Sequence, residues 1–122
     1  HLTQIEERLK TWRKQLLEIS DKKGCLGDFE IPIEKQGGFY QVLEHCPSIQ
    51  RNRQDLGSSQ MVYQAKLKKN LVTTEDDTHL KGVMKALAEA IDICLAKNEY
   101  SEKQNLCDWC KKHRADGGNI RR

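Results

Sequence analysis

The sequence predicts an all-α fold, a bundle of four or five helices with an irregular or short-strand excursion at about residues 24–38. Two long stretches carry apolar residues at helical spacing, while glycine and proline gather in the excursion. Charged residues make up 32% of the chain and aromatic residues only 6%, which favours amphipathic helices with wide hydrated faces. We expect residues 1–122 to form one helical domain, excised from a longer chain because the sequence starts at His1.

The first predicted helix covers residues 2–20 and ends near Gly24, which is expected at its C′ position. Its apolar residues recur at spacings of 3, 4, 3, 4 and 3: Leu2, Ile5, Leu9, Trp12, Leu16 and Ile19. So narrow a stripe is typical of one seam, either inside the protein's own bundle or against a partner helix. We name these six residues the seam, and they are the predicted partner-binding residues.

The excursion at 24–38 allows two structures. Phe29–Ile33 alternates apolar and polar residues, which predicts a short extended segment or an edge strand because Pro32 excludes a central one. A hairpin across Gly37 and Gly38 would follow from that strand. The alternative is a loop that packs its apolar residues over the bundle.

Two helices are expected in the middle of the chain. Helical spacing over Phe39–Cys46 predicts two turns that stop before Pro47. Residues 47–58 are polar, and Gly57 followed by Ser58 and Ser59 predicts an interruption. One of these two serines is then expected to cap a helix over about residues 60–70.

The most apolar helix is predicted to open at Thr74, as the N-cap, and to form the centre of the core. Asp76 and Asp77 are assigned to its negatively charged first turn, a role that accounts for both. Its continuous apolar stripe is Leu80, Val83, Met84, Leu87, Ile91, Cys94 and Leu95. A last helix is expected at about 102–114, after a capping box at Ser101.

A possible metal site lies in that last helix, where a C-x-x-C pair is followed by a histidine. Zinc needs about four sulfur or nitrogen ligands, so a ligand from elsewhere would have to complete the set of Cys107, Cys110, His113 and Cys94. His45 and Cys46 are other sources of the fourth ligand. There are two alternatives: a thioredoxin-type redox pair, or two small apolar residues of an amphipathic helix. We expect no cofactor, with zinc as the alternative.

Nucleic-acid binding is a second alternative, although the net charge of +3 favours it only weakly. Basic residues gather around Trp12 on the first helix and after Trp109 on the last. If the two helices are adjacent, they form one basic surface from Lys10, Arg13, Lys14, Lys111, Lys112 and Arg114.

The remaining features bear on location and function class. No stretch approaches the ~20 apolar residues of a membrane span, and no signal peptide is visible. The five irregularly spaced cysteines favour a reducing compartment, hence the cytoplasm or nucleus. Because no catalytic motif occurs, we expect a non-catalytic adaptor or regulatory module that binds another protein or a second copy of itself. A nucleic-acid accessory factor and a small zinc-stabilised domain are the alternatives.

Overall fold

The computed structural model describes residues 2–97, and the predicted helix at 102–114 lies outside them. The α-helices of the described part are α1 (Leu2–Ser20), α2 (Phe39–His45), α3 (Gln50–Lys68) and α4 (Thr74–Lys97). Two short 3₁₀ helices, η1 (Pro32–Lys35) and η2 (Pro47–Ile49), flank α2. Since residues 2–97 contain helices and no strand, the all-α prediction is confirmed, and the edge strand and hairpin considered for residues 29–43 are wrong.

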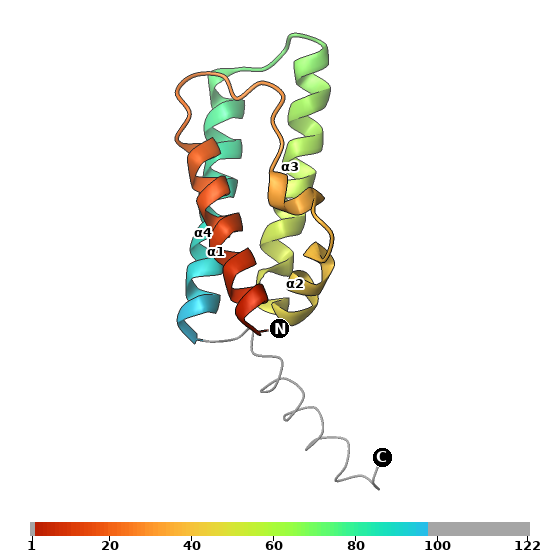
Figure 1. The fold of residues 1–122 in the computed structure, drawn as a ribbon. Helices are drawn as coiled ribbons and strands as arrows, with labels where there is room; N and C mark the ends of the chain where they lie inside the picture. Colours follow the sequence, from red (N-terminus) through yellow and green to blue (C-terminus); the bar gives the residue numbers. More distant parts are fainter. Residues whose placement is uncertain (1, 98–122) are drawn as a thin grey trace, which may run out of the picture.

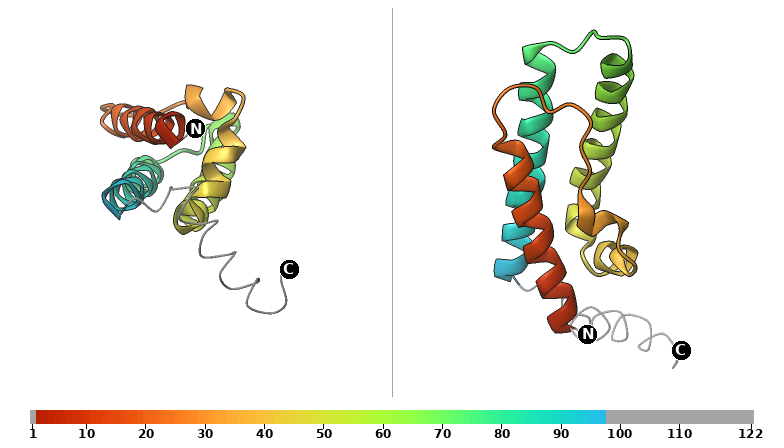
Figure 2. Two further views of the ribbon diagram at one scale, coloured as in Figure 1. Left: turned by 60° about the horizontal axis from the view of Figure 1, so that its bottom comes forward. Right: turned by 45° about the horizontal axis from the view of Figure 1, so that its top comes forward.

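The three long helices lie lengthwise beside one another, with α4 packed against both α1 and α3. The chain between α1 and α2 runs back along the bundle between α1 and α3 (Figure 1). Figure 2 shows α1, α4 and α3 at three corners when the bundle is viewed toward one end. We call residues 21–38 the connecting segment; Leu26, Ile31 and Ile33 are its buried apolar residues.

Helix α1 covers the predicted residues, Leu2–Ser20, but its C-terminus is not closed by Gly24 as expected. Its last turn closes at Ser20, a buried residue whose hydroxyl donates a hydrogen bond to the Leu17 carbonyl at 3.0 Å. The backbone N–H of Asp21 donates to the same carbonyl. Gly24 is therefore not the C′ residue; it lies in the connecting segment with a φ of +80°, where glycine has no steric penalty.

Helix α3 runs without a break through Gly57, so the predicted interruption, and the cap at Ser58 or Ser59, are wrong. Packing overrides the weak helix propensity of these residues because α3 and the turn before it present one apolar face to the core. Its fully buried members recur every seven residues: Ile49, Leu56 and Tyr63. A seven-residue spacing returns to nearly the same side of a helix.

The C-terminus of α3 is a Schellman motif. Asn70 takes a left-handed conformation with a φ of +57°, which asparagine tolerates better than most residues. Its N–H bonds the Leu67 carbonyl at 3.1 Å, and the N–H of Leu71 bonds the Lys66 carbonyl at 2.9 Å. The carbonyls of Lys66 and Leu67 are thereby satisfied, and the chain turns toward α4.

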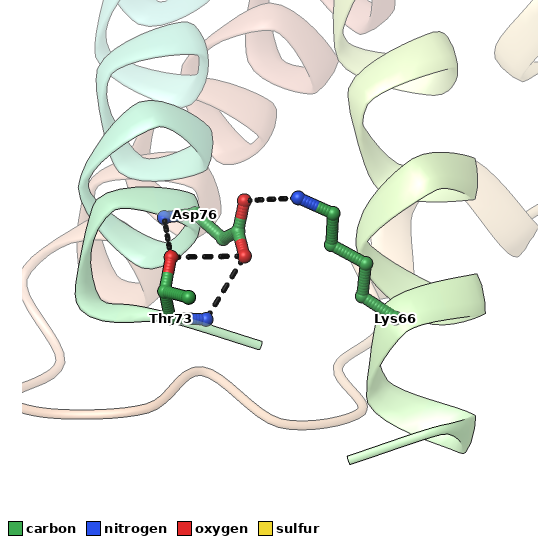
Figure 3. A network of polar contacts seen from close by, with 3 residues as sticks. All are labelled: Lys66, Thr73 and Asp76. Carbon is green, nitrogen blue, oxygen red and sulfur yellow. Dashed lines mark hydrogen bonds and ion pairs between the residues drawn. The ribbon is translucent and has the colours of Figure 1, made fainter. Parts of the chain in front are cut away.

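The N-cap of α4 is Thr73 rather than the predicted Thr74. The Thr73 hydroxyl accepts a hydrogen bond from the Asp76 N–H at 3.2 Å, and Asp76 Oδ2 accepts one from the Thr73 N–H at 2.9 Å (Figure 3). This reciprocal arrangement is a capping box, and it places the helix start one residue earlier than the threonine pair alone suggested. Lys66 of α3 donates to the other oxygen of Asp76 at 2.8 Å (Figure 3).

Asp77 departs from the role predicted for it. It is buried, with a relative exposure of 7%, and it begins the buried stripe of α4 rather than facing solvent in the first turn. The apolar part of the stripe is buried as predicted at Leu80, Met84, Leu87, Ile91 and Cys94, with Val83 and Leu95 half-buried.

A polar latch fastens the connecting segment to α3 and α4. Asp77 Oδ1 accepts hydrogen bonds from the Leu26 N–H at 2.9 Å and from the Tyr63 hydroxyl at 2.6 Å. The Tyr63 oxygen in turn accepts the Gly27 N–H at 3.2 Å and lies 3.3 Å from Cys25 Sγ. Because the tyrosine proton points to Asp77, the Cys25 thiol is the donor to Tyr63. We call these five residues the latch.

Burial raises the pKa of Tyr63, and the hydrogen bond to Asp77 raises it further. The phenol therefore stays protonated and keeps donating to Asp77 throughout the usual pH range. The latch satisfies polar groups that would otherwise be buried without partners, each at a cost of about 1–3 kcal/mol.

Tyr63→Phe should lower the free energy of unfolding by about 1–3 kcal/mol, because Gly27 loses its acceptor and Asp77 loses one donor. Urea denaturation monitored by circular dichroism would measure the change. Tyr40→Phe is the matched control, since Tyr40 is 80% exposed and should shift stability by less than about 0.5 kcal/mol. Equal effects of the two substitutions would contradict the latch.

The cap of α4 predicts a definite acid sensitivity. The hydrogen bonds from Lys66 and Thr73 lower the pKa of Asp76 from 3.8 to about 2. A depressed pKa stabilises the fold above pH 3.8, and the stabilisation is lost as pH falls toward 2. The stability advantage of the native chain over Asp76→Asn should therefore shrink over that interval in parallel urea titrations. An advantage that stays constant would contradict this role, and Asp55→Asn, at an exposed position of α3, is the control.

Candidate docking groove

The seam predicted to bind a partner faces the protein's own core. Ile5 is 4% exposed, Leu9, Trp12 and Leu16 are fully buried, and Ile19 is half-buried against the core. Leu2 lies in the first turn of α1. Packing of α1 within the bundle accounts for the apolar spacing. Of the two interpretations, the seam inside the protein's own bundle therefore holds, rather than a seam against a partner helix. Docking is therefore sought on another surface.

Of the three α1 residues in the predicted basic surface, two are engaged in ion pairs. Lys10 pairs with Glu6 at 3.6 Å, and Arg13 pairs with Asp92 of α4. Lys14 has no acidic partner among residues 2–97. The other members of the predicted basic surface lie outside the described residues: Lys111, Lys112 and Arg114. A joined basic surface thus stays a prediction.

Of the four predicted zinc ligands, one lies within the described residues and three lie outside them. Cys94 is buried in the core stripe of α4, and the other three, Cys107, Cys110 and His113, lie outside the described residues. Within residues 2–97 no group of three or more His, Cys, Asp or Glu side chains is placed to hold a metal ion. Zinc binding at the C-x-x-C pair stays a prediction.

A groove of about 540 Å³ lies between the connecting segment, α2 and α3. We call it the docking groove. Its apolar lining is Phe29, Ile31, Phe39, Tyr40 and Leu43. Its polar lining is Asp28, Glu30, Glu34, Lys35, Arg53, Gln54, Gln60 and Gln64. Elements far apart in the sequence meet here because the connecting segment is held beside α3 (Figure 1).

Glu34 is the central polar residue of the groove. One of its oxygens accepts a hydrogen bond from Trp12 Nε1 at 2.9 Å, and the other accepts one from Arg53 Nη2 at 2.7 Å. Burial raises the pKa of Glu34 above its ordinary value, against the opposing effects of Arg53 and Trp12. Both oxygens are thus used to join η1 to α1 and α3.

Gly57 makes room for this arrangement. A Cβ at that position would lie 3.0 Å from Arg53 Nη1. Because glycine has no Cβ, the Arg53 guanidinium can lie close to the α3 backbone at Gly57, one turn further along the helix. The Arg53 side chain is 28% exposed and that of Glu34 12%, which makes this ion pair less hydrated than the others near the groove. Gly57 thus leaves space for the Arg53 guanidinium and does not interrupt α3.

The rim of the groove carries the most exposed large apolar side chain in the described part. Tyr40, on the outer side of α2, is 80% exposed, while Phe39 beside it is buried against Trp12 with ring centroids 4.8 Å apart. Arg8 donates to the Gly38 carbonyl at 3.1 Å and fixes the start of α2. Tyr40 is therefore presented on a fixed element and not on a mobile loop.

A second hollow, of about 210 Å³, lies between α3 and α4 beside Val62 and His79. Met61 and Val62 next to it are 72% and 58% exposed. Because this hollow has less than half the volume of the docking groove, we take the docking groove as the stronger candidate.

Sequence reasoning assigned no role to Glu34, Arg53 or Tyr40, and it misassigned Asp77. One signal was available for Asp77: it continues the 3-4 spacing of the buried stripe of α4 by one position, as a polar residue at a core site. Glu34 carried no such signal, because its partners lie on α1 and α3, far away along the chain.

The pKa of Glu34 predicts a pH dependence opposite in sign to that of Asp76. A raised pKa means that the folded state binds the proton more tightly, so stability falls as pH rises above 4.5. The stability of the native chain relative to Glu34→Gln should decline over that range in urea titrations. A relative stability that rises with pH would show that Arg53 outweighs burial. Glu30→Gln, at an exposed ion pair of the same segment, is the control.

Comparison with known proteins adds no further constraint on the site. None of the helices described is long and apolar enough to cross a membrane. No protein-family model, curated protein or solved structure matches this chain. Its function is accordingly argued from the geometry of the docking groove.

Proposed function

We propose that this chain is a non-catalytic protein-interaction module, of adaptor or regulatory type, that binds another protein through the docking groove. The observation that supports the proposal is the combination of a groove of about 540 Å³ with the exposed ring of Tyr40 at its rim. Interfaces between proteins concentrate binding energy in aromatic and arginine residues at a partly apolar centre bordered by polar groups.

The chemistry of the lining favours binding over a reaction. Both oxygens of Glu34 are occupied by donors from the protein itself, and Arg53 is held by that carboxyl group. The remaining charged residues, Asp28, Glu30 and Lys35, are exposed at the rim and carry both signs. A mixed-sign rim suits a protein surface better than a polyanion.

An intracellular location fits this proposal. The five irregularly spaced cysteines favour a reducing compartment, and the exposed Cys25 thiol acts as a hydrogen-bond donor in the latch. The partner is then a cytoplasmic or nuclear protein.

A display library of protein fragments, selected against the full 122-residue chain, tests the proposal. Fragments that bind the native chain should lose at least about tenfold in affinity for Tyr40→Glu, because an aromatic anchor is replaced by a charge. Met61→Glu is the matched control, since Met61 is 72% exposed but lies on α3 outside the groove. Biolayer interferometry would supply the dissociation constants.

Two results would contradict the proposal. Affinities unchanged in Tyr40→Glu and lowered in Met61→Glu would place binding on the α3 surface instead. A failure to select any fragment whose affinity depends on Tyr40 would remove the groove as a docking site.

A further inference from the structure

One wall of the docking groove consists of backbone without hydrogen-bond partners. Between the latch at Leu26–Gly27 and the contact of Ile33 with Gln15, the N–H groups of residues 28–31 donate to no atom within residues 2–97. The carbonyls of residues 28–30 likewise accept no hydrogen bond in this part of the chain. Residues 28–31 all line the groove, and Ile31 has extended dihedral angles.

Helix α3 lines the groove with side-chain amides that also lack hydrogen-bond partners among residues 2–97. Gln54, Gln60 and Gln64 follow one another along α3 and line the groove, and none of their amide groups has a hydrogen-bond partner among the described residues. An amide group supplies both a donor and an acceptor. The lining of the groove therefore combines unpaired backbone of the connecting segment, unpaired amides of α3 and apolar side chains.

The charges of the groove leave one acidic residue unpaired. Glu30 pairs with Lys35, and Glu34 pairs with Arg53 at 2.7 Å. Asp28 is exposed and has no ion pair within residues 2–97. The ring of Tyr40, also at the rim, can accept a cation on its face. The unpaired Asp28 carboxylate and the exposed Tyr40 ring thus both favour a basic residue on the ligand.

From these features we propose that the docking groove binds a partner segment in extended conformation, which pairs with the backbone of residues 28–31. The segment carries a large apolar side chain for the groove and a Lys or Arg near Asp28. This inference rests on the proposed function and names the class of partner.

A helix is a poorer occupant for a physical reason. A helical ligand satisfies its own backbone and would cover the unpaired groups of residues 28–31 without bonding them, at a cost for each group removed from water. An extended segment bonds them, as when a peptide strand is added to an exposed backbone edge. Its length of about 3.3 Å per residue lets four residues span about 13 Å of groove.

A random 12-residue peptide library displayed on phage, selected on the full native chain and counter-selected on Tyr40→Glu, tests the inference. The selected peptides should share a basic residue and an aromatic or aliphatic one. Synthetic copies N-methylated at single central amides, which keep every side chain but lose one backbone donor, should bind at least about tenfold more weakly. Isothermal titration calorimetry would measure each affinity.

Charge reversal on the protein gives the second readout. Asp28→Lys should weaken the selected peptides about fivefold or more, whereas Glu89→Lys, the same charge change on an exposed position of α4, should leave them unchanged. Both positions are exposed, so each variant should fold normally.

Three outcomes would overturn the inference. Peptides that depend on Tyr40 but tolerate every N-methylation, or that gain helical circular dichroism on binding, leave the groove as a docking site with a different class of ligand. Selected peptides rich in acidic residues would refute the charge argument. A library that yields no peptide dependent on Tyr40, together with failure of the fragment selection, removes the docking groove itself.

Discussion

The buried carboxyl group of Asp77 holds the rest of the architecture together. It bonds Leu26 of the connecting segment and Tyr63 of α3 at once, from a position at the start of the core stripe of α4. Lys81 of α4 adds a further attachment to the connecting segment, a hydrogen bond from its ammonium group to the Gly24 carbonyl at 3.0 Å. Since that segment forms one wall of the docking groove, a single buried polar contact links core packing to the candidate site.

The connecting segment is attached differently along its length. At its first part the latch bonds Leu26 and Gly27, while further on Gln15 accepts the Ile33 N–H and Trp12 donates to Glu34. The stretch between these attachments, residues 28–31, is held in place at both ends but keeps its backbone N–H groups unpaired within residues 2–97. A backbone fixed in position and still free to bond loses little conformational entropy on binding.

Long-range polar contacts limited what could be read from the sequence. The helices α1, α2 and α4 follow from apolar spacing, Pro47 and the threonine pair, because these signals are local. Helix α3 was misread at Gly57, where the glycine accommodates Arg53 and a seven-residue apolar spacing sustains the helix. The groove could not be predicted, since Glu34 and Arg53 meet only after the connecting segment folds back along the bundle.

Residue-resolved amide hydrogen exchange, followed by NMR on the full chain, tests the central claim most directly. The account predicts that the amides of Leu26 and Gly27 exchange on the order of 100-fold more slowly than those of Phe29 and Glu30, because only the first pair is hydrogen-bonded. Equal exchange rates for these four amides would contradict it, whether all four were protected or all were open.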